Sequence, residues 1–443
     1  MRLSPVSRLA TYATGISQRP DHLAHLLTYP ATMARQPMTK HKLPAVWMRA
    51  GTSKGLFIKR EHLPVDQTKW IEPLLAAMGA DSRQLNGVGG ATSTTSKVAV
   101  VGKSAMEGVD VDYTFAQVSV GGEKVDFSGN CGNIASGVGP FAIQEGLVQQ
   151  VKNGETKVHV RIFNTNTERI IIETVEVDDN GHVQEVGNYA MPGLHGITGS
   201  EVKVAFANPA GSMTGQLFPT SNPWDYLTIS ATETGCKPFT VRATLLDVAN
   251  PFILVDASTL PFELQDSKRD DALYLSLVES IRREGAVRMG LAHYIEAAAQ
   301  VRGTPKIAFL WSAPDDKANI RVRSFSMGKP HPSLQLTGAV CLGAGMCLPD
   351  TVPSRLANLA KRIGDKQELP TPSRTPSPVS LRKQMLNHYA TQTVKIEHPS
   401  GLIEVEVVTQ YSLGNEGAQI QVERCIVSRT ARRLFEGNIY FYL

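Results

Sequence analysis

Short runs in which apolar and polar residues alternate cover most of the chain. This period of two is typical of β-strands, whose successive side chains point to opposite faces of a sheet. Turn-forming glycine, proline, asparagine and aspartate residues separate the runs. We therefore expect strands at residues 45–48, 56–58, 98–101, 109–120, 157–163, 169–177, 202–206, 240–245, 252–255, 306–310, 319–326, 393–397, 402–408, 419–427 and 437–443.

Few segments have the spacing of an α-helix. Residues 66–79 and 267–288 predict amphipathic helices, and residues 134–146 place apolar side chains at helical intervals. Residues 337–345 predict a small-residue turn that opens a further helix. Many short strands with two such special helices indicate an α+β protein, in which each domain rolls a sheet around one helix.

A turn at residues 128–133 leads into the helix predicted at 134–146. Cys131 therefore lies at the N-terminus of that helix, which we call the helix mouth. Ser128 or Asn130 could cap that helix. Backbone N–H groups at a helix start lack intrahelical partners, so such a place attracts anions and lowers the pKa of a thiol. We therefore expect a carboxylate to dock beside Cys131.

Residues 337–345 repeat this pattern, with Cys341 near the start of the second helix. Two such stretches suggest two related halves that face one another across a cleft. The alternative is that each cysteine is a small buried hydrophobe and each glycine cluster is an ordinary loop. The spacing alone favours neither interpretation.

The length of 443 residues is too great for one ordinary core, so two domains are expected. The predicted organisation is a leader at residues 1–42, an N-terminal domain at 43–225 and a C-terminal domain at 226–443. A turn-rich stretch at 208–224 marks the boundary. A Pro/Ser/Thr tract within residues 367–382 cannot build a core and predicts a disordered insertion.

Charge and cysteine content narrow the function classes. The net charge of +4 comes from scattered basic residues, which argues against nucleic acid and suits a small acidic substrate. Five cysteines without a C-x-x-C pair argue against a disulfide framework and against a zinc or other metal site. A reducing compartment follows, and no apolar run is long enough to span a bilayer.

The first 42 residues are rich in arginine, and Asp21 is their only acidic residue. This composition is similar to that of a mitochondrial presequence. The alternatives are a disordered leader, or a start of translation at Met33 or Met38. We expect a cytoplasmic or mitochondrial-matrix protein rather than a secreted one.

Two polar loops could supply hydrogen-bond donors. Residues 49–55 match the G-x-S-x-G pattern of serine hydrolases, but a β-type run follows where that motif needs a helix. In the structural interpretation, these residues form a hairpin turn. In the functional interpretation, Arg49, Ser53 and Lys54 donate hydrogen bonds to a carboxylate.

Residues 87–97 match neither a dinucleotide fingerprint nor a P-loop. By composition, Lys97 at their end is more often a surface charge than a buried base.

Several motifs stand in order along the chain, at residues 49–55, 89–99, 130–133, 161–166, 209–211, 288–291, 331, 337–339 and 429–434. Together these motifs resemble the PrpF family. Members of that family include methylaconitate isomerases, aconitate and methylitaconate Δ-isomerases, and oxalomesaconate tautomerases. The resemblance extends from about residue 43 to the C-terminus, and it identifies the family rather than the substrate.

This resemblance implies the diaminopimelate-epimerase-like fold. In that fold two similar domains each wrap a β-barrel around a central helix, and the active site lies between the two helix N-termini. The implied chemistry is a 1,3-proton shift, without a cofactor, that moves a C=C bond within an unsaturated di- or tricarboxylate. The expected partner is that small molecule, and a homodimer is left open.

The resemblance also assigns roles to residues. The family's catalytic lysine falls on Lys97, which reverses the surface interpretation, and its active-site cysteine falls on Cys131. Cys341 lies near the second acid/base cysteine of related epimerases but not right at the helix mouth. The residues implied in substrate binding are Arg49, Ser53, Lys54, Thr95, Ser96, Asn130, Gly132, Asn133, Arg288, Lys329, His331, Thr337 and Gly338.

Some family members carry serine where this chain has Gly132, so a hydroxyl that could hold substrate is missing here. Two other functions use the same scaffold. A two-cysteine racemase or epimerase would need Cys131 and Cys341 together at the cleft. A non-catalytic binding protein would hold a tricarboxylate without exchanging its protons.

Overall fold

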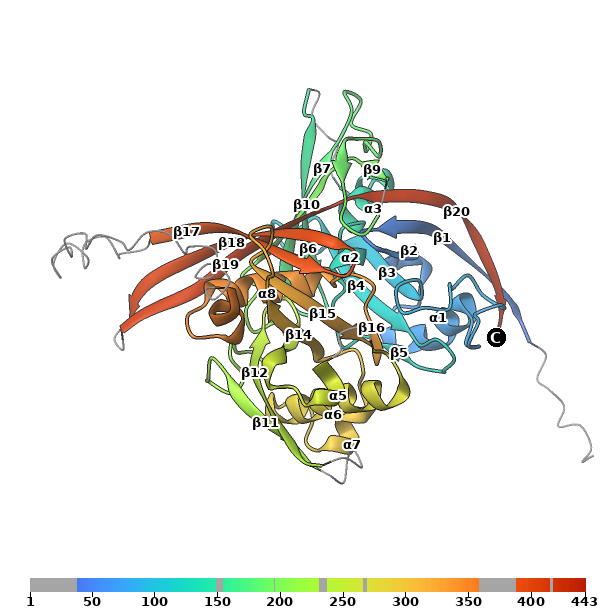
Figure 1. Cartoon of the computed structure of the whole chain (residues 1–443). Helices are drawn as coiled ribbons and strands as arrows, with labels where there is room; N and C mark the ends of the chain where they lie inside the picture. Colours follow the sequence, from blue (N-terminus) through green and yellow to red (C-terminus); the bar gives the residue numbers. More distant parts are fainter. Residues whose placement is uncertain are drawn as a thin grey trace, which may run out of the picture. The chain divides into compact units, whose positions relative to one another are not determined.

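The computed structural model describes residues 38–148, 154–194, 196–230, 237–265, 269–357, 388–414 and 417–443 (Figure 1). Residues 40–443 form one unit by their internal contacts. The predicted leader, except for its last few residues, and the predicted insertion at 367–382 lie outside the described residues.

The first half of the chain begins with a hairpin of β1 (Lys40–Ala50) and β2 (Ser53–Lys59). Both faces of this hairpin are buried: Met48 and Phe57 lie in one core cluster, and Trp47 and Leu56 lie in another. Around this hairpin lie the other elements of the half: η1 (Arg60–His62), η2 (Gln67–Trp70), α1 (Ile71–Met78), β3 (Lys97–Lys103), β4 (Val111–Val118), β5 (Val125–Asp126), α2 (Gly132–Ala135), α3 (Val138–Gln144), β6 (Lys157–Asn164), β7 (Arg169–Glu176), β8 (Tyr189–Ala190), β9 (Thr198–Gly199) and β10 (Val202–Ala207).

The second half begins with β11 (Asp225–Ile229), β12 (Phe239–Asp247) and β13 (Pro251–Asp256). The later elements are η3 (Ala257–Thr259), α5 (Phe262–Gln265), α6 (Ala272–Arg288), α7 (Ile295–Gln300), β14 (Lys306–Ser312), β15 (Ile320–Ser326), β16 (Lys329–Pro330), α8 (Leu336–Cys347), β17 (His388–His398), β18 (Gly401–Gly414), β19 (Gly417–Arg429) and β20 (Ala431–Tyr442).

The two halves repeat one strand-pairing pattern. In the first, β3 runs parallel to β2 and antiparallel to β4, and β6 then runs parallel to β4. In the second, β14 runs parallel to β13 and antiparallel to β15, and β17 runs parallel to β15. A buried helix precedes the last of these strands in each half, α2 with α3 before β6 and α8 before β17. This repeat confirms the predicted α+β fold of two similar halves, each with strands around a buried helix.

The halves also share strands. The last strand, β20, pairs along the whole of β1, and β10 pairs with β19. One hydrophobic core therefore contains buried side chains of both halves, such as Phe57, Phe141, Phe252 and Val340. The domain boundary at residue 225 remains a prediction.

Close packing around helix α8 requires the small residues at 337–345, the stretch predicted as the second helix mouth. Its residues 336–345 are all buried, and it packs against β17, β18 and β19 (Figure 1). A Cβ at Gly338 would lie 2.8 Å from the ring of Phe252, so only glycine admits that ring. The stretch predicted as a turn is thus helix from Leu336 onward.

The helix predicted at 134–146 is also corrected. It is divided into α2 and α3 around Ser136 and Gly137. Pro140 has no N–H to donate to the carbonyl of Ser136, which interrupts the helical ladder there. The N-cap residue is Cys131 rather than Ser128 or Asn130, and no side chain caps the helix.

Candidate active site

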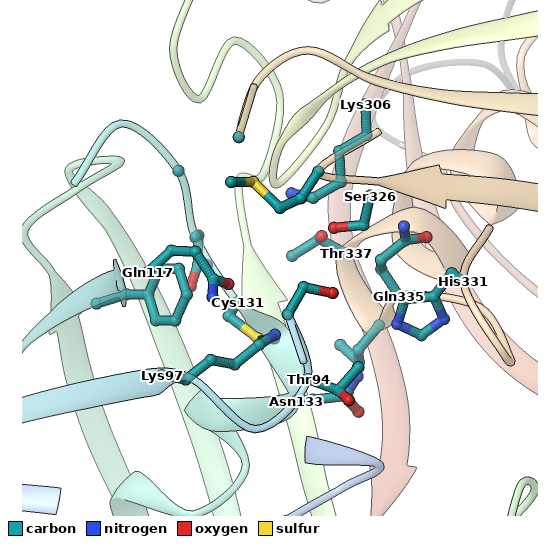
Figure 2. A pocket seen from close by; sticks show the side chains of 18 of the residues that line it. Thr94, Lys97, Gln117, Cys131, Asn133, Lys306, Ser326, His331, Gln335 and Thr337 are labelled. Atoms are coloured by element: carbon teal, nitrogen blue, oxygen red, sulfur yellow. Dashed lines mark hydrogen bonds between the residues drawn. The ribbon is translucent and has the colours of Figure 1, made fainter. Parts of the chain in front are cut away.

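A pocket lies where the start of α2 meets the start of α8. Both halves contribute to its walls, so the predicted cleft between two helix mouths is present. Figure 2 shows Lys97 and Cys131 on one side and Lys306 on the other. The lining residues are Ser93, Thr94, Lys97, Phe115, Gln117, Asp126, Gly129, Asn130, Cys131, Gly132, Asn133, Gly303, Lys306, Ser326, Met327, His331, Gln335, Leu336 and Thr337.

Lys97 and Cys131 form a contact pair in this pocket. The Lys97 Nζ donates to the Cys131 Sγ at 3.0 Å, and the two residues are 8% and 9% exposed. Strand β3 delivers the lysine from its first position, and the turn before α2 delivers the cysteine. The ring of Phe115 covers the ammonium at 5.7 Å and limits its access to water.

This pair controls the charge on the thiol. Burial by itself raises the pKa of Cys131, but the charge and hydrogen bond of Lys97 and the Ile134 N–H more than offset that effect. The pKa of Cys131 therefore lies below its usual range. A proton can pass between sulfur and nitrogen across the short contact, so the pair can take up or release a proton as a unit.

The segment around the N-terminus of α8 contributes His331, Gln335 and Thr337 to the pocket. Burial lowers the pKa of His331 to about 3, and Lys97 adds to that effect, so the imidazole is neutral near pH 7. Its Nδ1 accepts a hydrogen bond from the Ser333 N–H at 3.2 Å. Among the described residues, the Gln335 Oε1 and the Asn130 Oδ1 are buried without a hydrogen-bond partner. These side-chain oxygens could accept hydrogen bonds from a ligand.

We expect His331 to make the protein sensitive to acid. The pKa of a histidine in the unfolded chain is about 6.5, whereas that of folded His331 is about 3. Between these values the unfolded chain binds the extra proton, so the free energy of unfolding falls as the pH drops from 6.5 towards 3. Urea unfolding at several pH values should show a shallower fall for His331→Gln than for wild type. The exposed His293→Gln is the matched control, and equal slopes for all three proteins would contradict this assignment.

Five of the predicted substrate-binding residues line the pocket: Asn130, Gly132, Asn133, His331 and Thr337. The Asn133 Oδ1 already accepts from the Arg429 Nε at 3.2 Å, which fixes that side chain. At Gly132, a Cβ would lie 2.6 Å from the Leu336 side chain. Leu336 therefore takes the space that a side chain at position 132 would need.

The hairpin residues do not line the pocket. The Arg49 guanidinium donates to the backbone carbonyls of Gly51 and Thr430, at 3.2 and 2.8 Å. Ser53 is buried, while the Lys54 side chain is exposed. The hairpin turn thus supports the site through its backbone, because the Lys54 N–H holds the Thr94 carbonyl at 2.9 Å.

Other predicted binders also lie outside the pocket lining. Thr95 bonds to Thr92, and the Ser96 hydroxyl donates to the Val118 carbonyl. Arg288 pairs with Glu284 on the surface of α6, and Lys329 is exposed on β16. Gly338 and Cys341 are buried inside the core on α8.

Comparison with known proteins identifies the relatives of this fold. The sequence profile described as "PrpF protein" matches residues 40–370 and 371–442. The chain is 34% identical to 2-methyl-aconitate isomerase of Cupriavidus necator, over 89% of this chain and 96% of the relative. The chain belongs to the PrpF family. It is an isomerase, as its curated relatives are.

Two further relatives of this PrpF-family isomerase are named for methylitaconate. The 3-methylitaconate isomerase of Eubacterium barkeri is 34% identical, over 90% of this chain and 97% of the relative. The crystal structure of a methylitaconate-delta-isomerase superimposes with a TM-score of 0.63 at 31% identity, covering 91% of this chain and 96% of that chain.

None of the helices in the described ranges combines the length and the hydrophobicity that a membrane-spanning helix needs.

Sequence reasoning missed Lys306, which lines the pocket from the second half of this PrpF-family protein. Loss of hydration lowers its pKa to about 8, and the charge of Lys97 adds to the drop. A signal did exist: the strand predicted at 306–310 begins with a lysine, as does the strand that Lys97 opens. Ser93, Thr94, Gln117, Asp126, Ser326 and Gln335 were also missed.

Proposed function

We propose that this PrpF-family isomerase moves a C=C bond within an aconitate-like di- or tricarboxylate by a 1,3-proton shift. Lys97 is the base, and Cys131 is its proton-sharing partner. The observation that carries the proposal is the 3.0 Å contact of Lys97 with Cys131 inside a pocket built by both halves. The names of relatives that act on 2-methyl-aconitate and 3-methylitaconate support this substrate class.

The chemistry needs a base in a site that stabilises negative charge. Removing a proton from the allylic carbon leaves an anion that spreads over the C=C unit onto the neighbouring carboxylate. When the shared proton resides on the Cys131 sulfur, the Lys97 amine is free to accept the proton from carbon. The ammonium groups of the pocket then face the charge that develops, in surroundings with little water to screen it.

The racemase alternative needs a second thiol at the cleft. Cys341 is fully buried on α8, and its Sγ lies 3.6 Å from the Leu246 carbonyl. Burial raises the pKa of Cys341 well above its usual range, which keeps that thiol protonated. The geometry therefore favours the isomerase over the two-cysteine racemase.

The test is proton NMR in D₂O with cis-aconitate, trans-aconitate and 2-methylaconitate. Loss of an allylic proton signal together with a new vinyl signal is the expected result and ranks the acids. Tight binding of all three acids without loss of any proton signal would contradict the proposal and favour a binding protein.

A further inference from the structure

Lys306 and Lys97 hold matching places in the two halves of the fold. Each opens a strand that runs parallel to the second strand of a hairpin, β3 beside β2 and β14 beside β13. Each of these strands then pairs antiparallel with the next one, β4 or β15. Both lysines line the same pocket, so the repeat delivers one amine to the site from each half.

The surroundings of Lys306 leave its amine available to a ligand. No hydrogen bond or ion pair involves its Nζ among the described residues, and its closest ring contact is Phe252 at 5.8 Å. Burial lowers its pKa most and Lys97 adds to that effect, whereas Cys131, Asp126 and Cys341 act in the opposite direction, and the balance is a pKa of about 8. An amine of this kind exchanges protons readily near neutral pH.

The position of Lys306 suits the second half of a 1,3-proton shift. Figure 2 shows it across the pocket from Lys97 and Cys131, with Ser326 and Thr337 beside it. A 1,3-shift removes a proton at one carbon and adds one two carbons away. Two amines from opposite walls can serve these two carbons without moving the substrate between the steps.

We propose that Lys306 is the second proton-transfer group, whose ammonium protonates the far carbon of the allyl unit after Lys97 has removed the proton from the near one. This rests on the proposed function. The step is balanced: the C–H electron pair becomes the new C=C bond, and the old C=C pair forms the new C–H bond with the Lys306 proton. Lys97 gains one proton and Lys306 loses one, and solvent returns both groups to their starting states.

The competing role for Lys306 is that of a charge anchor for a substrate carboxylate. The two roles differ in what an arginine can replace. A guanidinium keeps the charge and binds carboxylates well, but it does not release a proton at neutral pH. Lys306→Arg therefore separates charge from proton transfer.

The experiment follows wild type, Lys306→Met and Lys306→Arg in D₂O with 2-methylaconitate and the two aconitates. Two rates are measured by proton NMR: product formation, and deuterium entry into recovered substrate at the near carbon. We expect both variants to lose product formation by about 100-fold or more, and deuterium entry to stay within about tenfold of wild type, since Lys97 still removes and returns the proton. Lys317→Met, at an exposed lysine of the same half, is the matched control.

The outcomes are distinct. Deuterium entry without product formation in both variants supports the proposal. Recovery of product formation in Lys306→Arg overturns it in favour of the charge anchor, as does a joint loss of both rates with a raised KM in Lys306→Met. In these cases wild-type turnover still upholds the proposed function. A wild-type protein that neither isomerises nor exchanges any of the three acids overturns both.

Discussion

Replacing Lys97 by methionine should lower kcat by about 10²- to 10⁴-fold, the usual contribution of a positioned general base. Methionine keeps the length and the apolar stem of lysine, so the volume beside the Phe115 ring stays filled, although the contact of the ammonium with the ring is lost. The amine that accepts the allylic proton is lost. Turnover is measured by proton NMR, and thermal unfolding shows whether the fold is intact.

The matched control for this variant is Lys103→Met. Lys103 lies at the other end of β3, is exposed, and does not line the pocket, so its replacement should leave kcat unchanged. Turnover at the wild-type rate in Lys97→Met would remove Lys97 from the mechanism. A thermal midpoint well below that of wild type would instead attribute the loss to unfolding.

The fold was predictable because its signals are local. Alternating or continuous apolar runs identified most strands, because strands such as β10 bury one face and strands such as β13 bury both. The turn before α2 identified the helix N-terminus that carries Cys131. The catalytic interpretation of Lys97 needed the family resemblance. By composition alone it is an ordinary lysine, and its burial results from the pairing of β3 with β4 and from the cover of Phe115.

The contacts that decide the rest of the site are not local. Arg49 is held by the Thr430 carbonyl because β20 returns to pair with β1, so a residue that looks like a free donor is occupied. Lys306 reaches the pocket only because β14 repeats the place of β3. No local pattern reveals the contact of Arg49, and the lysine that opens each strand points to the pocket only once the repeat of the two halves is known.

The residue at which α8 starts determines whether Cys341 lies at the pocket or in the core. The sequence places it near a small-residue turn, but α8 already begins at Leu336, and Thr337 takes the place at the pocket. Cys341 lies further along the helix and faces the core, with its Sγ near the Leu246 carbonyl. A shift of a few residues in the helix start thus separates a pocket residue from a core residue.

Cys131→Ser should lower kcat by about 10²-fold or more, at the low end of the range for a proton-transfer partner. The hydroxyl nearly matches the thiol in size, so the side chain still fits beside Lys97. It does not ionise near neutral pH, however, and so it cannot exchange a proton with the amine as a thiol does. The measurement is kcat by proton NMR. We expect KM to change less than kcat, because the groups that donate hydrogen bonds to the substrate carboxylates remain.

Thiol alkylation reports the same pair independently of turnover. In wild type, iodoacetamide should modify Cys131 at a lower pH than an ordinary thiol, because Lys97 lowers its pKa. Lys97→Met should slow that modification at neutral pH, since burial alone raises the pKa of the thiol. Equal alkylation rates in wild type and Lys97→Met would show that the 3.0 Å contact does not control the thiolate.

Cys341→Ala is the matched control for Cys131→Ser and also decides between the two chemistries that this scaffold could support. Cys341 contacts the core rather than the pocket, so its replacement should leave kcat near that of wild type, with some loss of stability from the smaller side chain. A two-cysteine racemase would instead lose activity with either replacement. If Cys341→Ala abolished turnover in a folded protein while Cys131→Ser did not, the Lys97 and Cys131 mechanism would be wrong.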